Sequence, residues 1–238
     1  MGVLSIGLAG WSCMGCGSVE PRPNADADAA PSVVDATVVD VRVPFDAPLV
    51  DAPPRDGPLR AMRVFVSSQV YTGNLGGLAG ADTKCQTVAN AAGLTGTYKA
   101  WLSNATIAAT TRLTHATIPY ALVDGTIVAN DWTSLTSGSL LHAIDLTELG
   151  THSLGGTSVD CYFGGTGMFA WTNTDVTGLV ANASQTSSCG GDWSSAGPTN
   201  GGGPFGVVGI IGSSDAMWTV SCGSARCENT APLYCLEQ

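Results

Sequence analysis

Residues 76–103 read GGLAGADTKCQTVANAAGLTGTYKAWLS, and this stretch changes from helical to strand-like character along its length. Apolar or small residues recur at helical spacing between Gly80 and Gly93, at Cys85, Val88, Ala89 and Ala92. That spacing places the four side chains on one face of a helix, and Gly93 suits the position just past its end. Residues 98–102 (YKAWL) are a strand candidate. The stretch therefore predicts a helix followed by a strand.

The remainder of residues 61–238 predicts an α+β domain with few regular elements. Residues 63–70 (RVFVSSQV) alternate and are rich in β-formers, which is typical of a strand. Asp124-Gly125 between two apolar runs predicts a hairpin over 120–129, with a type I′ turn. Beyond residue 136 Gly, Ser, Thr and Asn predominate, so we expect long loops there. The other expected elements are short helical segments at 104–112 (capped by Asn104) and 130–135, and closing strands at 216–221 and 232–236.

The N-terminal part of the chain differs in composition from the domain. In residues 1–16 a short apolar run is followed by small residues, Cys13 and Cys16, which is typical of a signal or lipoprotein-type N-terminus. No Lys or Arg precedes the run, and Leu is absent three positions before either cysteine, so a plain secretion signal remains an alternative. Residues 17–60 are rich in Pro and Asp and predict a disordered stalk that could extend roughly 130 Å. The alternative for this segment is an untethered tail.

The charge balance excludes several partners. The formal net charge is −10, with only nine Lys and Arg and no basic cluster. Phosphate backbones are bound by clustered cations, so we expect no nucleic-acid partner. No apolar run approaches the roughly 18 residues that a membrane span needs, so we expect membrane association only through a lipid anchor.

Six of the eight cysteines lie in the domain: Cys85, Cys161, Cys189, Cys222, Cys227 and Cys235. An even number of cysteines in an exported chain predicts a disulfide framework. A zinc site is the rival interpretation, but the domain contains no CxxC pair and its histidines are remote from the cysteine pairs. We expect no metal and no cofactor, and spacing alone leaves the pairing open.

Several blocks together resemble endostatin and, more closely, a family of bacterial surface lipoproteins of unknown function. Their order is kept across residues 63–238, and the first two blocks are the most specific. The blocks are residues 76–82 with Cys85, residues 91–94 with 96–103, residues 119–123, Trp132 with Leu135, Cys189 with Trp193, residues 221–222 and residues 233–237. The resemblance implies a C-type-lectin-like (endostatin-like) fold.

In that family pattern the helix cysteine pairs with the cysteine of the last strand, which implies Cys85–Cys235. The family pattern further implies an inner Cys189–Cys222 pair. The two remaining cysteines, Cys161 and Cys227, would then pair with each other. The arginine cluster and N-terminal histidines of endostatin have no counterpart here, and the calcium motifs of sugar-binding C-type lectins are absent.

Motifs for catalysis are not found. No G-x-S-x-G sequence occurs, and we expect His115 and His142 to be ordinary histidines, with a binding role considered for His152 in its Gly-rich loop. Two facing carboxylates could hydrolyse glycosides, but nothing in the spacing of the loop aspartates identifies a pair. Those aspartates are Asp160, Asp175, Asp192 and Asp215.

Trp171, Trp193 and Trp218 form a candidate ligand surface in the loop-rich half, with core anchors as the alternative. We therefore expect a secreted or cell-surface, non-catalytic binding domain, adhesin- or lectin-like, for an extracellular protein or carbohydrate. The alternatives are an envelope structural protein without a ligand and a hydrolase that uses the loop carboxylates.

Overall fold

The computed structural model describes residues 60–153, 159–160, 166–197, 204–221 and 223–238. Chain contacts divide the protein into units 1–54 and 55–238, and every described residue belongs to the second unit. The expected signal or lipoprotein segment 1–16, with Cys13 and Cys16, lies outside the described residues, as does the expected stalk up to residue 59. None of the helices in the described part has the length and apolar character that a bilayer crossing requires.

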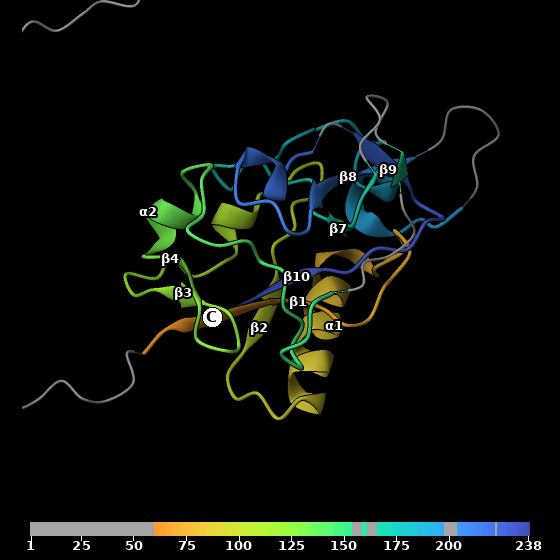
Figure 1. Ribbon diagram of the computed structural model, residues 1–238. Helices are drawn as coiled ribbons and strands as arrows, with labels where there is room; N and C mark the ends of the chain where they lie inside the picture. The colour runs from red at the N-terminus through yellow and green to blue at the C-terminus, as the bar shows by residue number, and fades with distance from the viewer. Residues whose placement is uncertain (1–59, 154–158, 161–165, 198–203, 222) are drawn as a thin grey trace, which may run out of the picture. The chain divides into compact units, whose positions relative to one another are not determined.

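The larger sheet of the domain has five strands, four from its first half and one from its C-terminal end, and helices α1 and α2 accompany it (Figure 1). Its strand order is β2-β10-β1-β3-β4, so the first strand and the last strand of the domain are hydrogen-bonded neighbours at its centre. β1 pairs antiparallel with β10 and parallel with β3. The elements are β1 (Met62–Val66), α1 (Gly77–Ala91), β2 (Tyr98–Ala100), β3 (Tyr120–Ala121), β4 (Ile127–Ala129), α2 (Trp132–Leu135) and β10 (Tyr234–Glu237).

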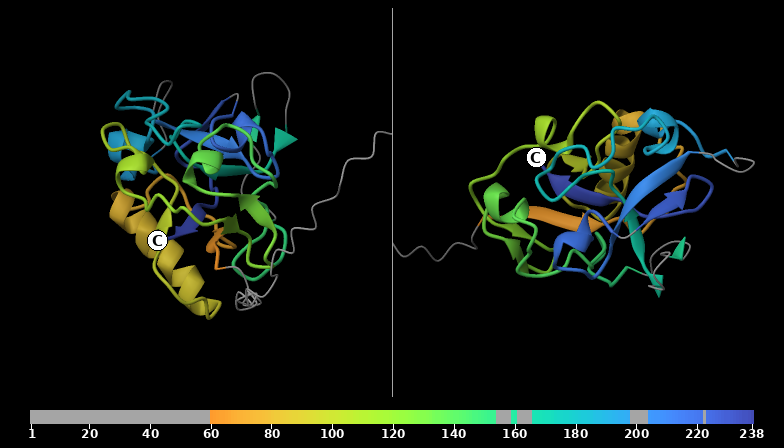
Figure 2. Two further views of the ribbon diagram at one scale, coloured as in Figure 1. Left: turned by 90° about the vertical axis from the view of Figure 1, so that its left-hand side faces the viewer. Right: turned by 90° about the horizontal axis from the view of Figure 1, so that it is seen from above.

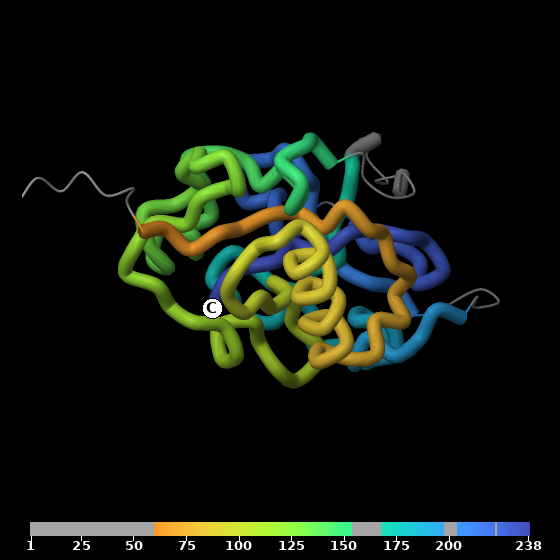
Figure 3. Tube along the Cα trace, turned by 90° about the horizontal axis from the view of Figure 1, so that it is seen from below, coloured from red at the N-terminus to blue at the C-terminus, as the bar shows by residue number. Residues whose placement is uncertain are grey.

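The alternation along β1 divides the core into two apolar clusters. Val64 and Val66 belong to one cluster with Tyr120 and Trp101, whereas Phe65 belongs to the other with the buried face of α1. Alternate side chains of a strand point to opposite faces, so both faces of the sheet are covered. α1 packs against β2 and β10, and Figure 3 shows it beside the part of the sheet away from the green β3–β4 hairpin.

A smaller sheet occupies the half of the chain that was expected to be loops. β7 (Phe169–Trp171), β8 (Phe205–Ile210) and β9 (Ser224–Arg226) pair antiparallel in the order β7-β8-β9. Figures 1 and 2 place this sheet at the end of the domain opposite the β3–β4 hairpin. A two-stranded ribbon, β5 (Val159–Asp160) with β6 (Thr166–Gly167), completes the described strands. The architecture is α+β, as the sequence predicts.

Three local predictions need correction. Residues 216–221 are not a strand, because Ala216–Trp218 is a short 3-10 helix (η3) whose first turn is capped by Asp215. Asn104 does not begin a helix through Arg112. Its Oδ1 instead accepts the N–H groups of Thr106 and Ile107 in a tight turn, and only Ala109–Thr111 (η1) is helical.

The third correction concerns the hairpin turn at Asp124-Gly125. Gly125 has φ +93°, but Asp124 is not among the described non-glycine residues with positive φ. A type I′ turn needs positive φ at both central residues, so the turn is of another kind. Leu122 N–H donates to the Thr126 carbonyl and Gly125 N–H to the Leu122 carbonyl, as in a three-residue loop that ends in a left-handed glycine.

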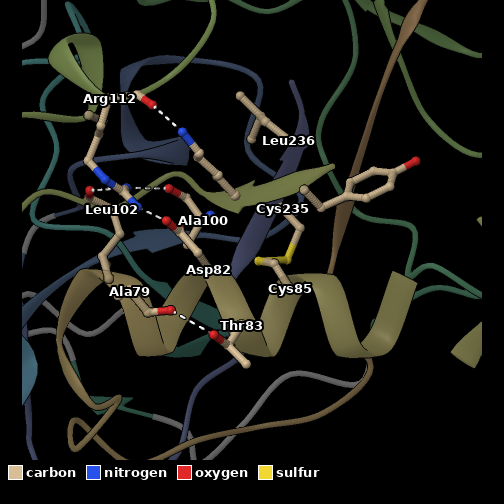
Figure 4. A network of polar contacts seen from close by, with 12 residues as sticks. Ala79, Asp82, Thr83, Cys85, Ala100, Leu102, Arg112, Cys235 and Leu236 are labelled. Atoms are coloured by element: carbon tan, nitrogen blue, oxygen red, sulfur yellow. Dashed lines mark hydrogen bonds and ion pairs between the residues drawn. A yellow bond between two sulfur atoms is a disulfide. The ribbon is translucent and has the colours of Figure 1, made fainter. Parts of the chain in front are cut away.

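Polar contacts fix α1 to the edge of the sheet (Figure 4). Asp82 of α1 accepts the N–H of Ala100 in β2 at 3.0 Å and forms an ion pair with Arg112. The Arg112 guanidinium also donates to the carbonyls of Ala100 and Leu102, at 2.9 Å each. One arginine therefore connects α1, β2 and the segment after η1.

Two disulfides are described. Cys85 of α1 is bonded to Cys235 of β10 with a Cα–Cα distance of 5.5 Å, which confirms the pair that the resemblance implies. The implied inner pair is wrong, because Cys189 is bonded to Cys227 and not to Cys222. The Cys161–Cys227 pair is wrong for the same reason. Cys161 and Cys222 themselves lie outside the described residues.

Candidate functional site

The tryptophans expected at a ligand surface are buried. Trp171 and Trp193 have no exposed surface, and Trp218 is 1% exposed. The indole N–H of Trp171 donates to the Tyr71 carbonyl, and that of Trp193 donates to the Ser103 carbonyl, each at 2.8 Å. The expectation of an exposed ligand surface at these three residues is therefore wrong, and the alternative, that they are core anchors, is correct. Trp171 and Trp193 belong to the core cluster that includes residues of β7 and β8, whereas the Trp218 ring contacts those of Trp101 and Tyr234.

The three histidines lie in two places. His115 stacks on Trp132 with ring centroids 4.1 Å apart, and its Nε2 lies 2.8 Å from the Thr110 carbonyl. His142 and His152 flank one carboxylate, with Nδ1 atoms 3.9 Å and 3.3 Å from the oxygens of Asp145. His152 is 77% exposed at its side chain, so this group is open to solvent. No cluster of three His, Cys, Asp or Glu suited to a metal ion occurs among the described residues.

The loop carboxylates are engaged locally. Asp175 accepts the N–H groups of Thr177 and Leu179, and Asp215 accepts the N–H of Met217. Asp192 accepts the hydroxyl of Ser194. These contacts are those of turn and cap residues. The side chain of Asp160 lies outside the described part of the structure.

A cavity of about 520 Å³ lies at one corner of the five-stranded sheet. The start of β1, the turn between β3 and β4 and the end of β10 surround it, three segments that pairing within the sheet brings together. Figure 3 shows the orange start of β1 beside the green hairpin. The cavity is lined by Arg60, Ala61, Arg63, Ala121, Leu122, Val123, Asp124, Gly125 and Glu237.

Strand register explains why these residues meet. Arg63 is the parallel partner of Ala121, and the Val64–Leu236 pairing places Glu237 next to Arg63 across β1 and β10. Arg63 and Glu237 lie on the face of the sheet that carries Phe65 and Cys235, which is the face that α1 covers over β2 and β10. Ala121 has only a methyl side chain at this corner, so space remains in front of it.

The cavity carries both signs of charge. The Arg63 N–H donates to Glu237 Oε2 at 2.9 Å. Burial raises the pKa of the Tyr98 hydroxyl, and a hydrogen bond to Arg63 opposes that rise. The Thr126 N–H, which donates to Asp124 at 2.9 Å, lowers the pKa of that carboxyl, so Asp124 is ionised at neutral pH. The residues that line the cavity therefore include two arginines, Arg60 and Arg63, and two acidic residues, Asp124 and Glu237.

Sequence reasoning did not find this site. Arg60 and Arg63 are two of only nine cations in the chain, and they lie beside the expected first strand. A cation pair in so acidic a chain was a usable signal. The proximity of Asp124 and Glu237 to the two arginines could not be predicted from the sequence. It depends on the parallel β1–β3 pairing and on the return of β10 to the centre of the sheet.

Comparison with known proteins gave no assignment. No protein-family model matches the chain, and a search of curated proteins found no match. The disulfides give the coarse location, because such bonds persist in oxidising compartments. They indicate a protein that resides outside the cytoplasm.

Proposed function

We propose that the protein is an extracytoplasmic, non-catalytic binding domain whose ligand occupies the cavity between β1, β10 and the β3–β4 turn. The observation that carries the proposal is the cavity itself, whose lining includes four charged residues beside apolar ones. Ligand sites are typically concave and apolar, with a few polar groups that fix orientation. The volume of about 520 Å³ is ordinary for such sites.

The walls of the cavity are held by rigid parts of the fold, which supports a binding role. β1 and β10 are the central strands of the sheet, and the Cys85–Cys235 bond fixes β10 to α1. Val123 to Gly125 are held by hydrogen bonds across the turn. A preformed site loses less conformational entropy when the ligand binds.

We also propose the finer fold assignment and the tether. An early helix bonded to the last strand, adjacent first and last strands and a second small sheet support a C-type-lectin-like (endostatin-like) fold. In this proposal residues 17–60 are a flexible stalk, and Cys16 or Cys13 carries a lipid that places the domain on the cell envelope. The partner is an extracellular protein or carbohydrate, and nucleic acid is not expected.

The second candidate is an envelope structural protein without a ligand. The buried state of Trp171, Trp193 and Trp218 favours it, because aromatic residues that could have formed a platform serve the core instead. The two candidates differ in one respect: a structural protein has no use for the cavity.

Arrays of glycans and of extracellular matrix proteins test the proposal with the full-length chain, with and without EDTA. Ala121→Leu and Ala61→Leu are the matched variants, because each fills part of the cavity from a different wall. We expect binding by the wild type and loss of binding in both variants, with unchanged thermal unfolding as the control. A blank on every array would favour the structural candidate.

A further inference from the structure

We propose that the cavity takes a small zwitterion of amino-acid or short-peptide size, with its carboxylate at Arg60 and Arg63 and its ammonium group at Asp124. This inference rests on the proposed binding function, and it adds the chemical class of the ligand. The relationship that carries it is the presence of two arginines and two acidic residues among the residues that line one cavity.

The cationic side of the cavity suits a carboxylate. No ion pair joins Arg60 or Arg63 to another residue within the described ranges, whereas Arg112 is paired with Asp82. A guanidinium presents several N–H donors in a planar array and binds carboxylates through two parallel hydrogen bonds. Arg63 uses its main-chain N–H, not its guanidinium, for the hydrogen bond to Glu237, so that bond takes up none of the guanidinium donors.

The anionic side suits an ammonium group at Asp124 rather than at Glu237. Glu237 already accepts the Arg63 N–H, and its Oε1 lies so close to Gly96 that a Cβ there would come within 2.8 Å. Asp124 is exposed on the turn, and one of its oxygens accepts the Thr126 N–H. The second oxygen of Asp124 is then the better acceptor for a ligand cation.

Charge balance argues against the other ligand classes. Arg60 and Arg63 together offset Asp124 and Glu237, so a polyanion would meet two carboxylates and a polycation two guanidinium groups. A neutral ligand would lose the charge-assisted hydrogen bonds that both sides offer. A zwitterion satisfies both sides, and Ala121 and Val123 are apolar lining residues for its uncharged part.

Alanyl-alanine and two capped forms test the proposal with the full-length protein by isothermal titration at low salt. N-acetyl-alanyl-alanine lacks the ammonium group, and alanyl-alanine amide lacks the carboxylate. We expect the free dipeptide to bind and each capped form to bind at least about tenfold more weakly, because each has lost a charge-assisted contact. Equal affinities for the free and capped forms would overturn the proposal.

Two variants assign the ends of the ligand. Arg60→Ala should weaken binding of the free dipeptide about tenfold and leave the amide form unaffected, because the amide form lacks the group that Arg60 binds. Asp124→Asn keeps an oxygen for Thr126 and should weaken the free dipeptide while leaving the N-acetyl form unaffected. Arg226→Ala, a change at an exposed arginine of β9, is the matched control. Variants with wild-type affinities for all three probes would contradict the assignment.

The outcomes separate this inference from the function on which it rests. If the arrays show a ligand that Ala121→Leu abolishes while no dipeptide binds, the zwitterion is wrong and the binding domain stands. If neither arrays nor dipeptides give binding, both proposals fail. Binding of the free dipeptide with the expected loss in Arg60→Ala and Asp124→Asn supports both.

Discussion

Gly206 of β8 lies against the ring of Trp171, so closely that a Cβ at Gly206 would stand 2.4 Å from Cζ3 of that tryptophan. The same Cβ would stand 2.9 Å from Cζ3 of Trp193. The two indoles meet edge to face with centroids 5.5 Å apart. The missing side chain at Gly206 is therefore what allows both rings to pack on β8.

Gly206→Ala should destabilise the domain by roughly 1–3 kcal/mol, because overpacking forces rigid rings or the strand to move. Gly197→Ala is the matched control, since a Cβ there meets nothing closer than 3.8 Å and its φ is not positive. Urea unfolding followed by tryptophan fluorescence measures the difference. Equal midpoints for the two variants would contradict this account of the packing.

Two glycines of β8, Gly206 and Gly209, show why the sequence did not predict the second sheet. Residues 205–210 read FGVVGI, and glycine normally weakens a strand because it has no side chain to pack. Here the neighbours supply the packing: Trp171 and Trp193 fill the space at Gly206, and the main chain at Trp218 fills that at Gly209. Such long-range compensation does not show in a local pattern. The helix that carries Cys85 was predictable because its periodicity lies within one segment.

Non-reducing peptide mapping should recover a Cys189–Cys227 peptide and a Cys85–Cys235 peptide. Cys161 and Cys222 are then the cysteines left in the domain, and we predict that they bond to each other in the oxidising compartment. Reduced and alkylated protein is the control digest. A Cys189–Cys222 peptide would instead restore the pairing that the family resemblance implies.

Arg112→Ala should lower the free energy of unfolding by about 1–3 kcal/mol, because the ion pair with Asp82 and two hydrogen bonds to carbonyls are lost together. The Arg112 side chain is 12% exposed, so water replaces these contacts poorly. Arg226→Ala, at an exposed residue, should change the unfolding midpoint little. Chemical unfolding of both variants and the wild type measures the difference. Equal free energies of unfolding for the two variants would contradict the role assigned to Arg112.

Acid should weaken the fold through its cap residues. The Ser134 N–H lowers the pKa of Asp131, and the Ser213 hydroxyl together with the Met217 N–H lowers that of Asp215, below the ordinary 3.8. A carboxyl whose pKa falls on folding stabilises the fold above its unfolded pKa, and that contribution is lost as pH falls through the folded pKa. The unfolding midpoint should therefore drop between about pH 6 and about pH 3.

The double variant Asp131→Asn, Asp215→Asn should have a shallower pH dependence, because asparagine caps a helix without titrating. Unfolding midpoints of the wild type and the double variant, measured at both pH values, make the comparison. A wild-type slope in the double variant would exclude these two groups as the cause.

The candidate site was less predictable than the fold. The turn at Asp124-Gly125 and the β1 residue Arg63 were each placed in a hairpin or strand from the sequence, but nothing local joins them. Their proximity depends on the parallel Arg63–Ala121 register. Parallel pairing of segments more than fifty residues apart depends on the whole sheet, and no short window of sequence encodes it.

The Cys85–Cys235 bond also determines how the domain would respond to tension. If Arg60 and Gln238 were pulled apart, β1 could peel from β10, and the chain before Cys85 and after Cys235 could straighten. The bond joins positions separated by 150 residues, so everything between them would be bypassed by a covalent link. An oxidised domain would therefore lengthen under load only by the chain outside the bond, residues 60–85 and 235–238, whereas a reduced domain could also extend the residues between the two cysteines.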